Sequence, residues 1–358
     1  MADNRETYME IGGEFYLDPN RFNKTPYNVV AYLEEEHPLF FDSGRSALCY
    51  ATQQIRHGTV LLPEYMCDSV IKTFRGFRIR FYRLKPSLEI DLDDLNSKID
   101  DSVSCVFLMH YFGALQTDSA LKRLKEIRRQ YKCVIIEDTT HSVFSEVRTI
   151  GDICVCSLRK WFALPGGGVL YGPGVVKTDK FAQLPHKTDN DRAYGMICKA
   201  LFIAGKLDCN HEYLEIFRET EERLDKQTKA YQISDFSRFI LHTVAVDAMI
   251  SQRKQNLMRV KEALRQMGIT PLCQINGENC PLVLPVWVKK RDELRERLME
   301  RRIYCAVHWP FDGVQVSERP LARELAAHMI SLPIDQRYGI AHMDYLMEVV
   351  NKYRGLFL

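Results

Sequence analysis

The chain has 358 residues, of which 46% are hydrophobic and 27% charged, with a formal net charge of +2. This is the balance of an ordinary soluble globular protein. The near-neutral charge excludes a basic footprint for nucleic acid or an anionic membrane, and no apolar run reaches the roughly 18 residues of a membrane span.

The cysteines and the amino-terminal residues indicate a reduced compartment. Eleven cysteines are scattered along the chain without a C-x-x-C pair, and the polar start at Met1 lacks the apolar core of a signal peptide. We therefore expect a cytoplasmic protein without a disulfide framework. No metal is expected, since His211-Glu212 lacks the second histidine of a metalloprotease helix.

The first part of the chain contains a candidate anion site. Residues 1–25 are polar with scattered aromatics and are interpreted as an arm, and residues 26–36 have helical character. Three apolar residues at 39–41 then stop at Asp42-Ser43-Gly44, and helix formers follow. Backbone N–H groups at such a helix start favour an anion, above all phosphate. A capped helix without a ligand, with Ser43 as its N-cap, is the alternative interpretation.

Strands and helices alternate between residues 39 and about 136, which is typical of a parallel α/β sheet. The predicted strands are 60–67, 77–84, 103–109 and 133–138, and the predicted helices are 92–99 and 118–131. Ligands of such sheets bind outside the carboxyl ends of the strands. The turn at 42–46, His110, Asp138 and His141 each follow a strand, so we expect them to converge.

Lys160 lies on a turn between two apolar stretches, residues 153–157 and 169–171, and is followed by the run Gly166-Gly167-Gly168. A lysine between two buried strands is costly to leave unpaired. Imine formation with a carbonyl cofactor is one chemistry that uses such a residue. A surface lysine on an ordinary β-hairpin is the competing interpretation.

The second half of the chain predicts a helical insert and a smaller domain. Residues 175–233 are polar and mostly helical. The further predicted elements are one or two helices over 236–267, strands over 282–288, 303–307 and 329–334, and helices over 291–301 and 343–353. We predict a large α/β domain at residues 1–235, which includes the arm and the insert, and a small α+β domain at 236–358.

Several of these motifs, in this order, resemble the DegT/StrS group of pyridoxal-phosphate-dependent sugar aminotransferases, within fold type I of the aspartate aminotransferase superfamily. Ser43-Gly-Arg-Ser-Ala-Leu48 is similar to the S-G-T-x-A-L phosphate turn, and Glu137-Asp-Thr-Thr-His141 to the E-D-x-A-H/Q element. The other similar stretches are His110-Tyr-Phe-Gly113, Gly151-Asp152 followed by Ser157, Lys160 seven residues before Gly167-Gly168, and Ser331-Leu-Pro-Ile334.

The resemblance implies an α/β fold of type I, with a mixed, mostly parallel seven-stranded sheet between helices, and pyridoxal 5′-phosphate (PLP) as the cofactor. Lys160 would form the imine and Asp138 would face the pyridine nitrogen, as the catalytic pair. His141 would contact the 3′ oxygen of the cofactor and Ser157 its phosphate. The remaining cofactor-binding residues that the resemblance implies are Gly44, Arg45, Ser46 and Cys67.

The sequence also departs from the family pattern. Lys160 follows Ser157 by three positions instead of five, Arg45 replaces a threonine, and Cys67 stands where an aromatic side chain often stacks on the cofactor ring. The shortened turn before Lys160 keeps a second interpretation open, a PLP enzyme of the same fold that acts on a non-sugar ketone or as a dehydratase. A non-catalytic, PLP-binding regulatory protein is a third.

The interpretation that the resemblance favours first is an aminotransferase. It would move an amino group from glutamate or glutamine to a keto sugar that is carried on a nucleotide. Arg159 and His308 are candidates for the substrate side. Arg159 either acts on Lys160 through like charge or points outward, and His308 either lines the substrate side or belongs to a packed loop. The resemblance further implies a homodimer with shared active sites.

Overall fold

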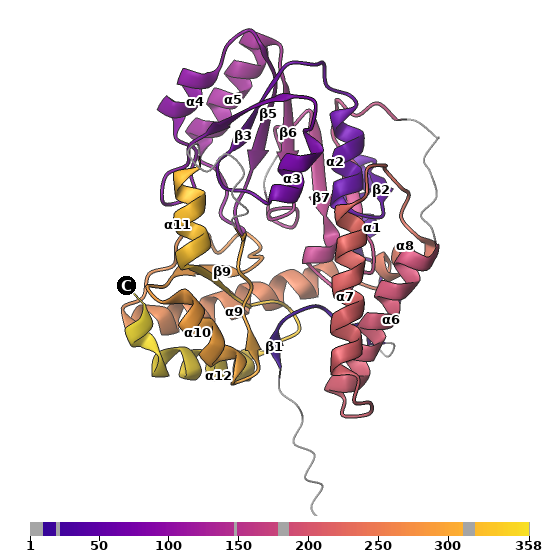
Figure 1. Ribbon diagram of the computed structural model, residues 1–358, viewed down its shortest axis with the longest axis vertical. Helices are drawn as coiled ribbons and strands as arrows, with labels where there is room; N and C mark the ends of the chain where they lie inside the picture. Colours follow the sequence, from indigo (N-terminus) through magenta and orange to yellow (C-terminus); the bar gives the residue numbers. More distant parts are fainter. Residues whose placement is uncertain (1–9, 19–21, 147–148, 178–185, 311–318, 358) are drawn as a thin grey trace, which may run out of the picture.

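The computed structural model describes residues 10–18, 22–146, 149–177, 186–310 and 319–357 (Figure 1). Its strands are β1 (Ile11–Gly12), β2 (Leu39–Phe41), β3 (Thr59–Pro63), β4 (Arg78–Tyr82), β5 (Val103–Met109), β6 (Val134–Asp138), β7 (Ile153–Ser157), β8 (Gly168–Tyr171), β9 (Leu284–Trp287), β10 (Ile303–Tyr304) and β11 (Met329–Leu332). The α-helices are α1 (Val29–Leu33), α2 (Gly44–Thr52), α3 (Asp68–Thr73), α4 (Leu92–Lys98), α5 (Asp118–Tyr131), α6 (His186–Ile203), α7 (Asn210–Asp225), α8 (Asp235–Leu241), α9 (Val246–Met267), α10 (Arg291–Met299), α11 (Pro320–His328) and α12 (Ile340–Lys352).

A seven-stranded sheet forms the centre of the larger part, in the order β2-β8-β7-β6-β5-β3-β4. Strands β3 to β7 pair in parallel, whereas β8 runs antiparallel to both β7 and β2. The predicted mixed, mostly parallel sheet is confirmed. The parallel strands end at one edge, so the residues that follow β3, β5, β6 and β7 are brought together there.

The central strands are apolar because both faces of the sheet are covered. Every residue of β3 and β5 is buried, and so are the last four of β6. Helix α5 packs against β6 through Leu124 and Ile127, while α2 packs against β7 and β8. Near-continuous burial of this kind is expected of parallel strands between two layers of helices.

The carboxy-terminal part builds a smaller unit of helices and strands, which lies below the large sheet in Figure 1. Strands β9 and β11 pair antiparallel, and α9 packs against α12. The amino-terminal strand β1 pairs in parallel with β10, so the predicted arm adds a strand to this unit. No helix in the described ranges is long and apolar enough to cross a membrane.

Two local predictions differ from the structure, and one alternative left open by the sequence is resolved. Helices α3 and α11 were not predicted; they are short, with six and nine residues. The strand predicted over 303–307 is limited to β10, whose partner β1 ends at Gly12 and Gly13, both with positive φ. Beyond that point Ala306 makes only an isolated bridge to Ser331. The single or double helix predicted over 236–267 is double, α8 and α9.

Candidate active site

A pocket of about 350 Å³ opens at the carboxyl edge of the parallel strands. It receives residues that follow β3, β6 and β7, the first turn of α2, part of α3, the end of α7 and the loop after β10. Among the predicted site residues, those that line it are Gly44, Arg45, Cys67, Asp138, His141, Ser157, Arg159, Lys160 and His308. The convergence expected from the strand ends is therefore present for the turn at 42–46, Asp138 and His141, whereas His110 does not line the pocket.

Lys160 is the last residue of a 3₁₀ turn, Leu158–Lys160, that follows β7 directly. The backbone N–H of Trp161 closes this turn by donating to Leu158 O at 3.0 Å. The Lys160 side chain is exposed to the pocket and is not packed between the strands as its sequence position suggested. Its ammonium group has no hydrogen bond or ion pair to any described residue, so it is available to a ligand.

Asp138 ends β6 on the floor of the same pocket and is buried. Burial raises the pKa of its carboxyl group above the ordinary value, although hydrogen bonds from Thr140 oppose the shift. One of these runs from the Thr140 backbone N–H at 2.9 Å. A buried carboxylate on a pocket floor favours a cationic ligand atom beside it, because such a neighbour would stabilise its charged form.

His141 lines the same pocket and lies in a cluster of rings. Its imidazole stacks on Phe112 at 5.0 Å and on the indole of Trp309 at 5.8 Å between ring centroids. Nδ1 accepts from the Phe112 backbone N–H at 3.2 Å, so Nε2 carries the proton of the neutral ring. Burial, with the charges of His308 and Lys160, lowers the pKa of His141 well below its ordinary value. His141 is thus a neutral donor at the pocket wall.

Glu137 and His110 fasten the strand ends that carry the site. His110 Nδ1 accepts from the Gln116 backbone N–H at 3.0 Å, so its Nε2–H donates to Glu137 at 3.2 Å. The other oxygen of Glu137 accepts the N–H groups of Ile150 and Gly151 at 2.7 and 2.8 Å. Both side chains are buried and saturated, so they hold β5, β6 and the approach to β7 in register.

The first turn of α2 lines the pocket beside the end of β7. Ser43 caps the helix by accepting from Ser46 N–H. As at any helix start, the N–H groups of the first helical residues have no intrahelical partners. A Cβ on Gly44 would lie 2.8 Å from the Cβ of Ser157, so only glycine lets the helix start approach that strand end. Gly168 is required likewise, since a Cβ there would meet Ser43 O at 2.0 Å.

Ser46 and Cys67, both predicted to bind the cofactor, differ in whether they line the pocket. The Ser46 hydroxyl is buried, accepts from Gln227 Nε2 at 2.8 Å and from Tyr231 N–H at 3.3 Å, and is not part of the pocket lining. Its role is to hold the segment after α7 onto α2. Cys67, the N-cap of α3, does line the pocket, with its thiol 3.0 Å from Ser69 Oγ.

Helix α7 supplies a wall that the sequence did not indicate. Its last two turns place Glu221, Leu224 and Asp225 in the pocket lining. Asp225 pairs with Arg45 at 2.7 Å, and Glu221 bridges Arg159 and Arg192. Arg159 therefore points into the pocket wall and not outward. A charged helix pattern alone gave no sign of these partners.

His308 and Trp309 form the side of the pocket contributed by the smaller unit. His308 Nδ1 lies 2.9 Å from Ser331 Oγ, and its backbone carbonyl accepts a hydrogen bond from Tyr65. Burial and the charge of Lys160 lower the pKa of His308 to about 3, so the ring is neutral near pH 7. The described residues include no group of three or more His, Cys, Asp or Glu side chains placed for a metal ion.

These residues fit PLP, the cofactor that the resemblance implies. Lys160, which has no partner among the described residues, faces the pocket, and the buried Asp138 carboxylate lines it. The start of α2 at Gly44, which has no side chain, lies beside Ser157. Lys160 would bind the aldehyde carbon, Asp138 would pair with the ring nitrogen, and the Gly44–Arg45 backbone with Ser157 would hold the phosphate.

Comparisons with known proteins agree with this geometry. Residues 52–185 match the family model of the class-V aminotransferases. A search among curated protein sequences found no match. Among solved structures, the aminotransferase TlmJ from Streptoalloteichus hindustanus is 15% identical, with a TM-score of 0.67 over 97% of this chain and 99% of TlmJ.

Two further solved structures have the same fold. DesV from S. venezuelae is 16% identical, with a TM-score of 0.65 over 96% of this chain and 91% of DesV. A DegT DnrJ EryC1 StrS aminotransferase from Brucella abortus is 15% identical, with a TM-score of 0.65 over 95% of this chain and 92% of its own. The family match and the shared fold confirm the predicted resemblance to the PLP-dependent aminotransferases of fold type I.

Proposed function

We propose that this protein is a PLP-dependent aminotransferase that transfers an amino group from glutamate or glutamine to a keto sugar carried on a nucleotide. The observation that carries the proposal is the meeting of Lys160, Asp138 and the α2 start in one pocket. These residues come from three separate segments of the chain. A lysine, a buried carboxylate and an anion cradle are together what PLP chemistry requires.

The cofactor, when bound, supplies a protonated pyridine ring that accepts electron density from the substrate carbon next to the amino group. Asp138 keeps the ring nitrogen protonated, because its buried carboxylate is stabilised by a positive neighbour. His141, neutral and protonated at Nε2, donates a hydrogen bond to the pocket. Ser157 and the α2 start would hold the phosphate through hydrogen bonds.

Lys160 moves the proton. Its Nζ, once free, would take a proton from the substrate carbon as a general base and deliver it to the C4′ carbon of the cofactor as a general acid. The 3₁₀ turn and the absence of a carboxylate partner among the described residues leave Nζ free to reach both positions. The neutral imidazole of His308 and the indole of Trp309 bind the acceptor, since they offer a hydrogen bond and a flat apolar face.

Absorbance spectroscopy tests the covalent role of Lys160. Purified protein mixed with PLP is expected to show a visible absorbance band that borohydride removes, with the reduced label on the peptide containing Lys160. Lys160→Ala is expected to lose the band, whereas Lys125→Ala, an exposed lysine of α5, keeps it. A band that survives in Lys160→Ala would show that another residue binds the cofactor.

The substrates are tested in two steps. Glutamate or glutamine should convert the visible band to that of the amine form of the cofactor, and failure with every amino donor would favour the non-catalytic interpretation. A panel of nucleotide-linked keto sugars, free keto sugars and non-sugar ketones then identifies the acceptor. Turnover of a non-sugar ketone alone would replace the proposed acceptor class. We also propose a cytoplasmic homodimer, to be checked by light scattering and fractionation.

A further inference from the structure

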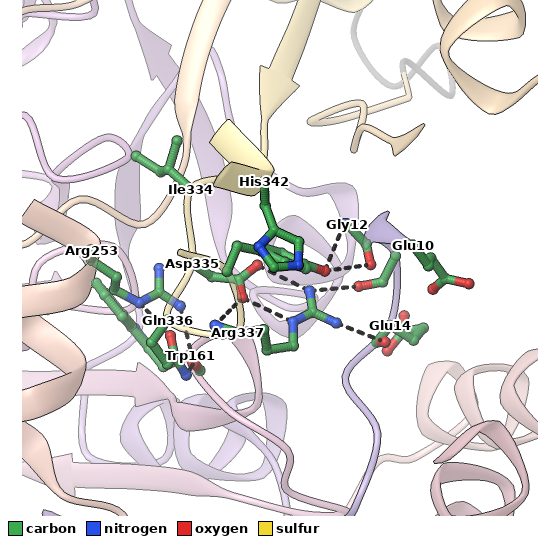
Figure 2. A network of polar contacts seen from close by, with 12 residues as sticks. Glu10, Gly12, Glu14, Trp161, Arg253, Ile334, Asp335, Gln336, Arg337 and His342 are labelled. Carbon is green, nitrogen blue, oxygen red and sulfur yellow. Dashed lines mark hydrogen bonds and ion pairs between the residues drawn. The ribbon is translucent and has the colours of Figure 1, made fainter. Parts of the chain in front are cut away.

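A buried arginine of the smaller unit reaches the turn that carries Lys160. Arg253, on α9, is fully buried. Its Nη2 donates to Trp161 O at 3.0 Å (Figure 2). Its Nη1 donates to Pro281 O and Leu282 O at 3.1 and 2.8 Å. The guanidinium also lies over the indole ring of Trp161, 4.7 Å from the ring centroid.

The partners of this cation are neutral. Nε donates to Gln336 Oε1 at 2.7 Å, and the nearby Asp335 carboxylate is bound by Arg337 instead. Burial of a charge without a hydrogen-bonded carboxylate is expensive. An apolar side chain would fill this space at lower cost, so the hydrogen bonds of Arg253 have a purpose other than packing.

Trp161 connects Arg253 to the turn that carries Lys160. It follows Lys160 directly, and its backbone N–H closes the Lys160 turn. Its indole Nε1 donates to Thr140 O at 2.7 Å, two residues beyond Asp138. The carbonyl of Trp161 receives two donors, Arg253 Nη2 and Gln336 Nε2, the latter at 2.6 Å. The Lys160 turn is thus held on the Asp138 side and on the α9 side.

Helix α9 anchors the other end of the same network. Asn256, three residues after Arg253 and on the same face, donates to Ile334 O, Asp335 O and Tyr338 O. Arg337 of that loop in turn donates to Gly13 O and Glu14 O of the amino-terminal segment. Figure 2 shows the chain of contacts from Trp161 through Gln336 to Arg337 and Glu14. The loop that carries Gln336 is therefore rigidly placed.

We propose that Arg253, together with Gln336, is a positioning residue for Lys160. It fixes the Trp161 carbonyl and so the direction in which the Lys160 side chain leaves its turn. This inference rests on the proposed function, in which Lys160 binds PLP and moves the proton. Displacement of a reacting group by about 1 Å commonly costs on the order of 100-fold in rate, whereas binding of the substrate, which uses other residues, changes less.

The test compares Arg253→Met with Arg259→Met. Arg259 lies on the same helix and makes an exposed ion pair with Asp344. With PLP bound, Arg253→Met is expected to shift the pH midpoint of the visible band by about 1 unit, and to lower kcat about 10- to 100-fold with a smaller change in KM. Arg259→Met is expected to match the unmodified protein in midpoint, kcat and KM.

A second variant covers the case in which Arg253→Met does not fold. Gln336→Leu, at a half-buried position, removes one donor to Trp161 O. It should shift the pH midpoint of the visible band in the direction in which Arg253→Met shifts it. Arg253→Lys should recover part of the loss. A normal midpoint and kcat in folded Arg253→Met and Gln336→Leu would overturn the positioning role alone. Absence of a borohydride-sensitive band in the unmodified protein would overturn the proposed function as well.

Discussion

Replacement of Glu221 by glutamine tests the wall that α7 builds. Glu221 bridges Arg159 and Arg192, with an N···O distance of 2.6 Å to Arg192. Both guanidinium groups are largely buried, at 13% and 6% exposure, while Glu221 is 48% exposed. Glutamine keeps the shape of the side chain and removes the charge, leaving two neighbouring cations without their common partner.

The expected cost follows from the pKa of Glu221. Burial alone would raise it, but Arg159, Arg192 and Lys160 hold it at about 2, below its ordinary 4.5. The shift of about 2.5 units corresponds to an upper limit of about 3 kcal/mol in the free energy of unfolding. Because the carboxylate is half exposed, solvent screening reduces this to about 1–1.5 kcal/mol.

The pH dependence has a definite sign. A carboxylate whose pKa is lower in the folded state stabilises that state fully above its unfolded pKa, near 4.5. The stabilisation is lost as pH falls from there through about 2, because both states then bind the proton. The difference between Glu221→Gln and the unmodified protein should therefore be constant from pH 7 to about pH 5 and shrink below it.

Urea unfolding, followed by tryptophan fluorescence at a series of pH values, measures this difference. Glu215→Gln is the matched control, since Glu215 on the same helix pairs with Arg218 at 3.5 Å and both are more than half exposed. Its expected effect is below about 0.5 kcal/mol. An equal loss in both variants, or a difference for Glu221→Gln that does not change below pH 4.5, would refute the reasoning.

Two further variants test the cofactor site. Asp138→Asn should keep its fold and still bind PLP but lose at least about 100-fold in kcat, because an amide cannot keep the ring nitrogen protonated; steady-state kinetics with unchanged turnover would contradict that role. Gly44→Ala should weaken PLP binding about 10-fold, because the new Cβ meets Ser157 at 2.8 Å and displaces the helix start. Spectroscopic titration measures it, with Gly277→Ala, where a Cβ meets nothing within 4 Å, as the control.

Much of the larger unit was predictable because its signals are local. The apolar run at 103–109 and the amphipathic pattern at 118–131 predicted β5 and α5 with the bounds that the structure has. The turn at Ser43-Gly44 predicted the α2 start for the same reason, since capping depends on neighbours within three residues. Parallel strands share one carboxyl edge, which is why Asp138, His141 and Lys160 could be expected in one place.

Contacts between distant segments were not predictable from local patterns. Arg45 and Asp225 are 180 positions apart, and Arg159 and Glu221 are 62 apart. The sequence of α7 shows only a charged amphipathic helix, whose carboxylates could equally face solvent. Ser46 illustrates the reverse case, since its motif suggested a phosphate ligand but the segment after α7 occupies its hydroxyl.

By itself, then, the sequence determined the alternation of strands and helices, the positions of the turns and the residue types of the proposed cofactor site, because periodicity, capping and strand ends are short-range properties. Only the tertiary structure decided that Lys160 opens into the pocket, that α7 closes one wall, and that Arg253 reaches Trp161 across 92 positions. These outcomes depend on which buried polar groups find partners, and the partners come from segments that meet only after the chain has folded.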